Sequence, residues 1–493
     1  MFYIMTKYYI TTTIPYVNGE LHLGHAMEFT EADSLARYHR QNGDEVLFSV
    51  GTDENGEKNF EVATKIGKDP KDYVDSMLPN VLEVQKAYGI APDRFIRTSD
   101  EAHHKRVQII WTQLKPYLYK SKYVGYYCVG CEEFKTETEY KENNKICPDH
   151  NREYEMREEE NYFFKLSSFT EQIKEAIESE KMRVVPDSKK NEILSLLNKG
   201  LEDISVSRPK AKLSWGVEVP DDPEHTIYIW FEALMNYITL IGYPEHEDFK
   251  KFWPADVQVL GKGVLRQHAA IWPAILLGIG VELPKELFVH GYVSVNSIKM
   301  SKSLGNSIDP IYLTSLFGQD AARYFFLAKI PSYGDGDFTW QKMLDVYNND
   351  LLNGLGNVIQ RTSMMIEKYL GGQIGENVPH SKHDNQAYHE ALADFRFDKA
   401  LEWTFGIIDG VNKYLEQTQP WILAKDENNM DHVREILLTC IADLREIATL
   451  LSPFMPQTSE MMKSIFGASL LAKIEGPVFP RVELPGELTA RPA

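Results

Sequence analysis

Apolar residues in the first part of the chain come in short runs that predict buried strands. The run at 7–14 is rich in β-branched and aromatic residues, and Pro15 and Gly19 follow it as breakers. Helical spacing of apolar residues comes next, at 22–41. Because strands that alternate with helices form parallel sheets, the pattern predicts an α/β fold. Its strands are expected at 7–14, 45–51, 226–231, 256–260 and 287–292.

The pattern changes twice further along the chain. Between about 116 and 225 the sequence is rich in Tyr, Lys and Glu and favours hairpins, so we expect an insertion that splits the sheet domain. From about 340 to 470 the apolar spacing is helical, with 371–386 connecting helices and a Pro-rich tail from Gly476. The predicted domains are 1–115 and 226–340 (the two halves of the sheet domain), 116–225 (the insertion) and 341–493 (an α-helical domain).

Composition narrows the class of protein. The 493 residues include 43% hydrophobic and 25% charged residues, which is ordinary for a globular chain and excludes disordered and fibrous classes. No apolar run is long enough to cross a bilayer, and the first residues lack a secretory signal, so we expect a cytoplasmic protein without membrane contact. The net charge of −19 argues against broad, sequence-blind binding of nucleic acid.

Three of the four cysteines fall within twenty residues of one another. Cys128 and Cys131 form a CxxC pair, and Cys147 and His150 follow as CxxH. Four such ligands make a closed tetrahedral zinc site with no open position, so the predicted zinc is structural. The spacing also favours a reducing compartment over a disulfide framework. Cys440 lies on an apolar helical face and is expected to be inert core.

The segment His22-Leu23-Gly24-His25 stands between the first predicted strand and the helix after it. The i,i+3 spacing places both imidazoles on one face of the first helical turn. Free backbone N–H groups and the helix dipole favour an anion there, and Gly24 allows a phosphate or an adenine ring to approach closely.

A second polar motif, Lys299-Met300-Ser301-Lys302-Ser303, follows the last predicted strand. Two lysines three residues apart, beside hydroxyl groups, suit a clamp for a triphosphate whose charge develops during phosphoryl chemistry. Alone, such a loop is usually solvated surface.

The two motifs together resemble those of class I aminoacyl-tRNA synthetases, and four other regions resemble the methionyl-tRNA synthetase family in particular. These regions are 14–16, 51–54, 230–237 and the run around His268. The resemblance extends over essentially the whole chain. One departure is Gly263, where the family commonly has an Asp expected to meet the ATP ribose; either another residue or water replaces that contact, or ATP is held less firmly.

The resemblance implies a Rossmann-like catalytic domain split by a zinc-knuckle insertion, followed by an anticodon-binding helical domain. It implies a monomeric ligase that activates L-methionine with Mg-ATP and transfers it to tRNA(Met). His22, His25, Lys299 and Lys302 would be catalytic, and Gly24, Ser301 and Lys302 would bind ATP. Asp53 would hold the methionine ammonium, and Asn357, Arg361 and Trp421 would read the anticodon. The thioether pocket would consist of Ile14, Tyr16, Trp230, Ala233, Leu234, Tyr237, Val264 and His268. Its aromatic edges suit a polarizable, apolar thioether.

Other enzymes and binding proteins remain as alternatives. Leucyl, isoleucyl and valyl enzymes resemble chains with a large editing insertion, for which 493 residues leave little room. Cysteinyl enzymes hold zinc in the amino-acid pocket, whereas the cysteines here lie in the insertion. A zinc-containing RNA-binding module without catalysis would not need intact motifs at 22–25 and 299–303. A small nucleotidyltransferase with an HxGH loop would not need the long helical region.

Overall fold

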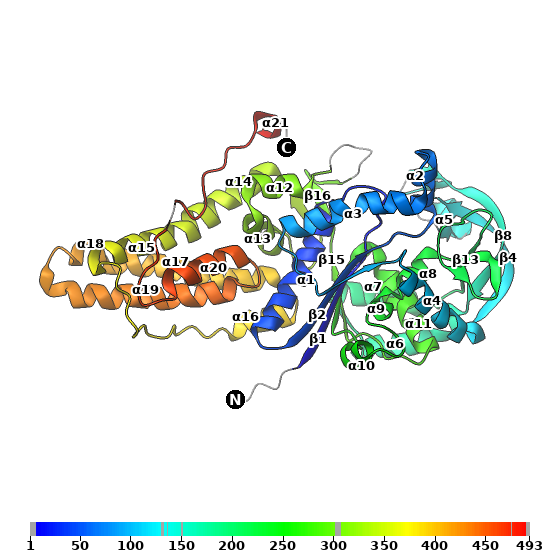
Figure 1. Cartoon of the computed structure of the whole chain (residues 1–493), viewed down its shortest axis with the longest axis horizontal. Coiled ribbons are helices and arrows are strands. Elements are labelled where there is room, and N and C mark those ends of the chain that lie inside the picture. The colour runs from blue at the N-terminus through cyan, green and yellow to red at the C-terminus, as the bar shows by residue number, and fades with distance from the viewer. Residues whose placement is uncertain are drawn as a thin grey trace. The chain divides into compact units, whose positions relative to one another are not determined.

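The computed structural model describes residues 6–129, 133–135, 137–148, 151–300, 307–474 and 476–489 (Figure 1). Its backbone forms two compact units. The first comprises Met1–Leu21, Gly43–Glu83 and Ala91–Val289, and the second comprises His22–Asn42, Val84–Ile90 and His290–Ala493.

A parallel six-stranded sheet forms the centre of the first unit, as the sequence predicts. Its strands are ordered β3-β2-β1-β14-β15-β9. The bounds are β1 Lys7–Thr12, β2 Glu45–Thr52, β3 Arg94–Arg97, β9 Arg183–Val185, β14 Val257–Gly261 and β15 Glu286–His290. In register, Ile10 pairs with Phe48 on one side and with Val257 on the other. β9 lies inside the range 116–225, so this sheet takes its edge strand from within the stretch expected to be an insertion.

The expected strand at 226–231 is wrong beyond Ile227. β13 (Asp222–Ile227) ends at Ile227, and helix α8 (Ile229–Ala233) begins two residues later. β13 also belongs to a separate antiparallel sheet with β11 (Ser207–Pro209) and β12 (Glu218–Val219). A short apolar run fits a strand and a buried helix equally well, so periodicity alone could not separate them.

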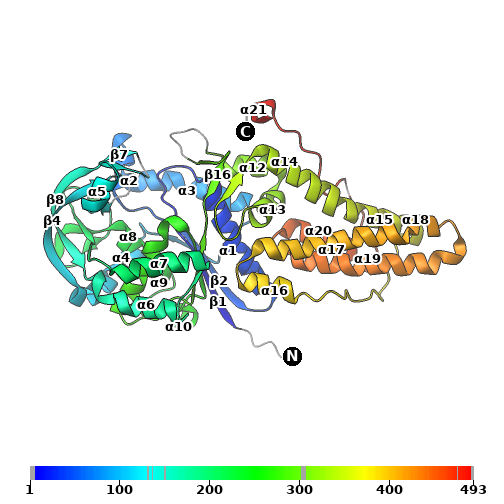
Figure 2. The same ribbon diagram turned by 180° about the vertical axis from the view of Figure 1, so that it is seen from behind.

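A long antiparallel pair of strands belongs to a four-stranded sheet in the remainder of the first unit. Its strands β4 (Leu118–Cys128) and β8 (Glu155–Phe164) pair from Leu118 opposite Phe164 to Tyr127 opposite Glu155. They lie side by side in both views of the chain (Figures 1 and 2). The predicted hairpins are confirmed by the antiparallel pairs of β4 with β5 (Glu133–Lys135) and of β6 (Ile146–Cys147) with β7 (Arg152–Glu153), and helices α6 (Thr170–Glu178) and α7 (Asp187–Lys199) follow.

The second unit is mainly helical, as expected for the C-terminal region. Helices α15 (Asn357–Leu370), α17 (Phe397–Thr418), α19 (Met430–Leu451) and α20 (Pro456–Phe466) form a bundle with buried apolar faces (Figures 1 and 2). Cys440 is 1% exposed in this core, as predicted. The unit also contains α1 (Leu23–Gln41) and α13 (Gln319–Lys329). Arg323 of α13 is fully buried and donates to Asp33 of α1 at 2.7 Å and to the Phe454 carbonyl at 2.7 Å.

In the part of the chain that the structure describes, no helix is both long enough and apolar enough to cross a membrane.

Candidate functional site

The loops after β1 and β2 meet at the carboxyl edge of the sheet, where ligands bind in folds of this kind. Tyr16 and Asp53 form an isolated parallel bridge, and the Asp53 N–H donates to the Pro15 carbonyl at 2.9 Å. Asp53 is 4% exposed. Gly51 lets the backbone of β2 lie close to Ile96 and Ile14, because a Cβ there would lie 2.4 Å from Ile96 and 2.9 Å from Ile14. The structure therefore brings together Ile14, Tyr16 and Asp53, three of the residues expected to bind the amino acid.

Aromatic side chains from α8 and α9 (Asn236–Thr239) supply further residues of the expected pocket. The Trp230 indole N–H donates to the Tyr16 hydroxyl. The Tyr237 hydroxyl lies 2.7 Å from Nε2 of His268, whose Nδ1 lies 2.9 Å from the Val264 carbonyl. Since a carbonyl only accepts, Nδ1 carries a proton and donates to it. His268 lies in a π-helical turn, Gln267–Ile271, a feature that often marks functional sites.

Exposure differs among the expected pocket residues. Ala233, Leu234, Tyr237 and His268 are buried, whereas Ile14, Tyr16, Trp230 and Val264 are partly exposed. Gly263, the departure from the family pattern, is exposed in a short turn at Lys262–Val264.

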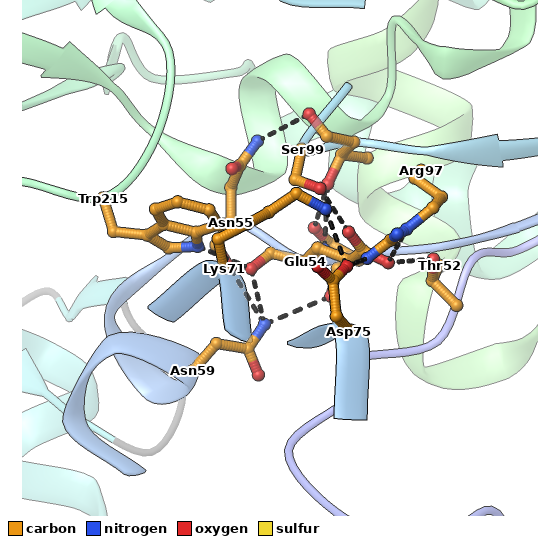
Figure 3. A network of polar contacts seen from close by, with 11 residues as sticks. Thr52, Glu54, Asn55, Asn59, Lys71, Asp75, Arg97, Ser99 and Trp215 are labelled. Carbon is orange, nitrogen blue, oxygen red and sulfur yellow. Dashed lines mark hydrogen bonds and ion pairs between the residues drawn. The ribbon is translucent and has the colours of Figure 1, made fainter. Parts of the chain in front are cut away.

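Glu54, the residue after Asp53, is the centre of a buried polar network that the sequence did not reveal (Figure 3). Its carboxylate accepts from Arg97 Nε at 2.7 Å and from Thr52 Oγ1 at 2.7 Å, and also from the Ser99 hydroxyl. Its main-chain oxygen accepts from the Trp215 indole N–H at 2.8 Å. These hydrogen bonds fix the position of Glu54 and therefore of the neighbouring residue Asp53.

Two charged residues nearer the surface, Asp75 and Lys71, extend this network. Arg97 also forms an ion pair with Asp75, which accepts from Lys71 at 2.7 Å. The hydrogen bond from Lys71 is the main cause that lowers the pKa of Asp75, and Arg97 lowers it further. Burial alone would lower the pKa of Arg97, but its bonds to Glu54 and Asp75 outweigh burial and raise it. The only sequence signal was that Glu54 lies in the region 51–54, which resembles the family's methionine pocket.

The expected phosphate-binding motif forms the start of α1 in the second unit. His22 is the N-cap, and its Nδ1 accepts from the Gly24 N–H at 3.1 Å. Nδ1 of His25 accepts from the His22 N–H at 3.2 Å. A Cβ on Gly24 would lie 3.0 Å from the His22 ring, so glycine leaves room for this cap. The expectation that both rings share one face of the first turn is confirmed.

One helical turn beyond these histidines lies a buried cluster that the sequence did not suggest. His290, at the end of β15, lies 2.9 Å from a carboxylate oxygen of Glu28 and 2.9 Å from the Gly291 carbonyl. Burial raises the pKa of Glu31. Burial alone would lower the pKa of His290, but the charges of Glu31 and Glu28 raise it to about 9.

Several expected residues lie outside the described residues. Ser301 and Lys302 belong to this group, and Lys299 is described only as part of the short strand β17 (Ile298–Lys299). Cys131 and His150 are outside as well. Cys128 and Cys147 are described, and both are buried in one small cluster with Tyr154. Among the described residues no group of three or more potential metal ligands occurs.

The three expected anticodon-binding residues meet in the second unit. The Arg361 guanidinium lies over the Trp421 ring at 4.5 Å and pairs with Glu416 at 2.7 Å. Asn357, Arg361 and Trp421 line a cavity of about 800 Å³. Met364 and Ile422 add exposed apolar surface nearby in sequence, at 65% and 47% exposure.

Comparisons with known proteins agree with this arrangement. The family model described as tRNA synthetases class I (M) matches residues 8–363. The methionine–tRNA ligase of Thermotoga maritima is 41% identical over 469 residues, covering 92% of this chain and 74% of that protein. That of Caldanaerobacter subterraneus is 40% identical over 475 residues, covering 92% and 73%.

A solved structure extends the similarity to three dimensions. Mycobacterium tuberculosis methionyl-tRNA synthetase in complex with methionyl-adenylate matches with a TM-score of 0.89 and 33% identity, covering 97% of this chain and all of that one. The chain therefore belongs to the methionyl-tRNA synthetases, the class I ligases that attach methionine to tRNA.

Proposed function

We propose that methionine binds at the carboxyl edge of the sheet, with Asp53 holding its ammonium group. The observation that carries this assignment is the pairing of Tyr16 with Asp53, because it places a buried carboxylate beside aromatic side chains. Asp53 supplies a charged partner for the ammonium, and Trp230 and Tyr237 supply polarizable surface for the thioether. Ile14, Ala233, Leu234, Val264 and His268 complete the proposed pocket.

The hydrogen bond between Tyr237 and His268 gives this pocket a defined polarity. Nδ1 of His268 donates to the Val264 carbonyl, so Nε2 is the acceptor for the Tyr237 hydroxyl when the ring is neutral. The Tyr237 hydroxyl therefore donates its proton to His268, and its oxygen can act toward a ligand only as an acceptor. A thioether needs no strong donor, whereas a hydroxyl or an ammonium in its place would lack a full set of partners.

In the first step, the methionine carboxylate attacks the α-phosphate of Mg-ATP to give methionyl-adenylate and pyrophosphate. His22 and His25 stabilise the phosphates through their Nε2 atoms. Both Nδ1 atoms accept main-chain N–H groups, which places the proton of each neutral ring on Nε2 as a donor. Gly24, between the two histidines, lets ATP approach the backbone closely. Lys299, Ser301 and Lys302 bind the leaving pyrophosphate.

In the second step, the methionyl group passes to the terminal adenosine of tRNA(Met). The cavity lined by Asn357, Arg361 and Trp421 receives an unpaired anticodon base. The partly exposed Trp421 indole offers a stacking surface, and the Asn357 amide and the Arg361 guanidinium can donate to a base edge. A few placed groups of this kind allow an acidic protein to bind one tRNA without attracting RNA in general.

The cysteines are proposed to hold one structural zinc ion in the insertion. Cys128 and Cys147 come from different strands, β4 and β6 (Ile146–Cys147), and share one buried cluster, which suits thiolate ligation. Cys131 and His150 would complete the set. The clustering of cysteines as metal ligands also favours the reducing cytoplasm as the compartment.

The experiment that tests the substrate is ATP–pyrophosphate exchange with each amino acid in turn, in the absence of tRNA. Methionine should stimulate exchange at concentrations at which leucine and cysteine do not. Stimulation by leucine or cysteine instead would overturn the assignment of the pocket. Replacing Lys302 with Ala should lower exchange far more than methionine binding, and an unchanged exchange rate would contradict the role of that lysine.

A further inference from the structure

Two buried side chains join two of the elements that form the proposed methionine pocket. Nδ2 of Asn55 donates to Oε1 of Glu232 at 2.8 Å. Asn55 is 1% exposed and Glu232 is fully buried. Asn55 follows Asp53 by two residues, and Glu232 immediately precedes Ala233 in α8. The bond therefore joins the loop with the proposed ammonium anchor to the helix with part of the thioether wall.

The loop end of this bond is rigid. Nδ2 of Asn59 lies within hydrogen-bond distance of three consecutive carbonyl oxygens, those of Asp53, Glu54 and Asn55, at 3.3, 2.9 and 3.2 Å. Asn55 also donates to the Thr98 carbonyl at 3.0 Å. A displacement of Asn55 would consequently displace Asp53 with it.

The helix end is equally constrained. Oε2 of Glu232 lies 2.7 Å from Nε2 of His103, in α4 (Glu101–Gln113). Nδ1 of the same imidazole lies 2.7 Å from the Thr239 hydroxyl of α9. Both carboxylate oxygens of Glu232 are thus occupied, one by the loop and one by a histidine that is itself fixed. A carboxylate with short hydrogen bonds on both sides holds its neighbours in one geometry.

We propose that Glu232 is a specificity-determining positioning residue. It sets the distance between the ammonium anchor at Asp53 and the wall at Ala233 and Leu234, and so selects the length of the amino-acid side chain. This inference rests on the proposed function, in which these residues bind methionine. One methylene group in an apolar pocket changes selectivity roughly 10- to 200-fold, so a small change in wall spacing has a measurable effect.

The test compares methionine with ethionine, the homologue with one more methylene on sulfur. The kcat/KM of each is measured by ATP–pyrophosphate exchange for wild type, Glu232→Asp and Glu232→Gln. The aspartate cannot reach Asn55 and His103 together, so we expect the methionine-over-ethionine ratio to fall about tenfold. The glutamine has the original length and offers an amide oxygen to Asn55, so its ratio should stay within about twofold of wild type.

Two other variants make the outcome decisive. Glu159→Asp makes the same change at another buried glutamate, in β8, where the carboxylate bonds Lys212 at 2.8 Å, and it should leave the ratio unchanged. Asn55→Ala removes the hydrogen bond between Asn55 and Glu232 from the loop side and should lower the methionine-over-ethionine ratio as Glu232→Asp does. If Glu232→Asp does not fold, Asn55→Ala alone tests the inference.

An unchanged ratio in Glu232→Asp or Asn55→Ala, with a normal wild-type preference for methionine, overturns this inference alone. An equal fall in Glu159→Asp also overturns it. Wild-type enzyme that methionine does not stimulate would overturn the proposed function and this inference together.

Discussion

The imidazole rings of His22 and His25 stack at the first turn of α1, with centroids 3.9 Å apart and planes 24° from parallel. Each ring accepts a main-chain N–H through Nδ1. The same pair therefore caps the helix and orients its Nε2 atoms as donors. Capping and phosphate binding use different nitrogens, so the two roles can be separated by substitution.

Replacing His25 with Asn should separate them. The amide oxygen can take the place of Nδ1 and keep the cap, while the Nε2 donor is lost. We expect exchange to fall about 100- to 1000-fold, the usual cost of removing one preorganised donor, with little change in the free energy of unfolding. His22→Ala is the comparison: it also removes the N-cap and should cost about 1 kcal/mol of stability. A normal exchange rate in H25N would contradict the phosphate role.

The Glu54–Arg97 pair should be important for both stability and methionine binding. Arg97→Met leaves the fully buried Glu54 carboxylate without its guanidinium, which we expect to lower the free energy of unfolding by about 3–5 kcal/mol. Glu54→Gln keeps a hydrogen-bonding group and should cost less. Urea unfolding of both variants and of the double variant measures the coupling. Additive losses would show that the two residues do not act together.

Methionine kinetics give a second measure of this network. Because Glu54 and Asp53 share one peptide, Glu54→Gln should raise KM for methionine more than it lowers kcat. A change in kcat alone would place the network outside substrate binding.

Local patterns in the sequence were sufficient to predict part of the site. The i,i+3 histidines and the run at 7–14 depend on neighbours in sequence, and both have the predicted structure. Asp53 and Tyr16 were expected at the methionine from the family resemblance, and the structure adds that they pair directly at the ends of adjacent strands.

Bonds between distant residues could not be predicted in this way. Glu54 and Arg97 are 43 residues apart in the chain, and Asn55 and Glu232 are 177 apart. Nothing in the spacing of either pair indicates contact, because the contact depends on the whole tertiary arrangement. A single sequence also gives no means of distinguishing the buried Glu232 from an exposed helical glutamate. These partners were therefore missed, although they hold the predicted residues in place.

The buried His290 should make stability depend on pH. Its pKa is raised to about 9 in the folded chain, against about 6.5 when unfolded. Its contribution is complete below pH 6.5 and is lost as pH rises through 9, so the free energy of unfolding should fall across this window. Burial raises the pKa of Glu31 to about 8, so Glu31 titrates in the same window and adds to the fall. Urea unfolding at pH 6, 7.5 and 9 measures the fall.

The charge of Glu31 provides the control for this pH effect. It is the largest of the charges that raise the pKa of His290, so Glu31→Gln should move the fall in stability to lower pH. Identical pH curves for wild type and E31Q would show that the pair is not coupled.

Trp421 should contribute to tRNA binding through its ring face. Stacking of one base on an aromatic side chain is worth about 1–3 kcal/mol, so Trp421→Ala should raise KM for tRNA(Met) about 5- to 150-fold in aminoacylation. Trp421→Phe keeps an aromatic face beneath Arg361 and should retain most of the affinity. If both variants lose affinity equally, the indole acts through packing and not through stacking.

The zinc proposal is tested by metal content. Purified protein should contain one zinc ion per chain, measured by mass spectrometry of the metal, and Cys147→Ser should lose it because a closed site needs all four ligands. Cys440→Ser is the matched control, since Cys440 is also buried but belongs to α19 in the second unit. It should keep the zinc. Because a structural metal contributes directly to folding, removal of zinc by a chelator should destabilise the segment between β4 and β8 and raise its protease sensitivity. Equal zinc content in C147S and wild type would contradict the ligand assignment.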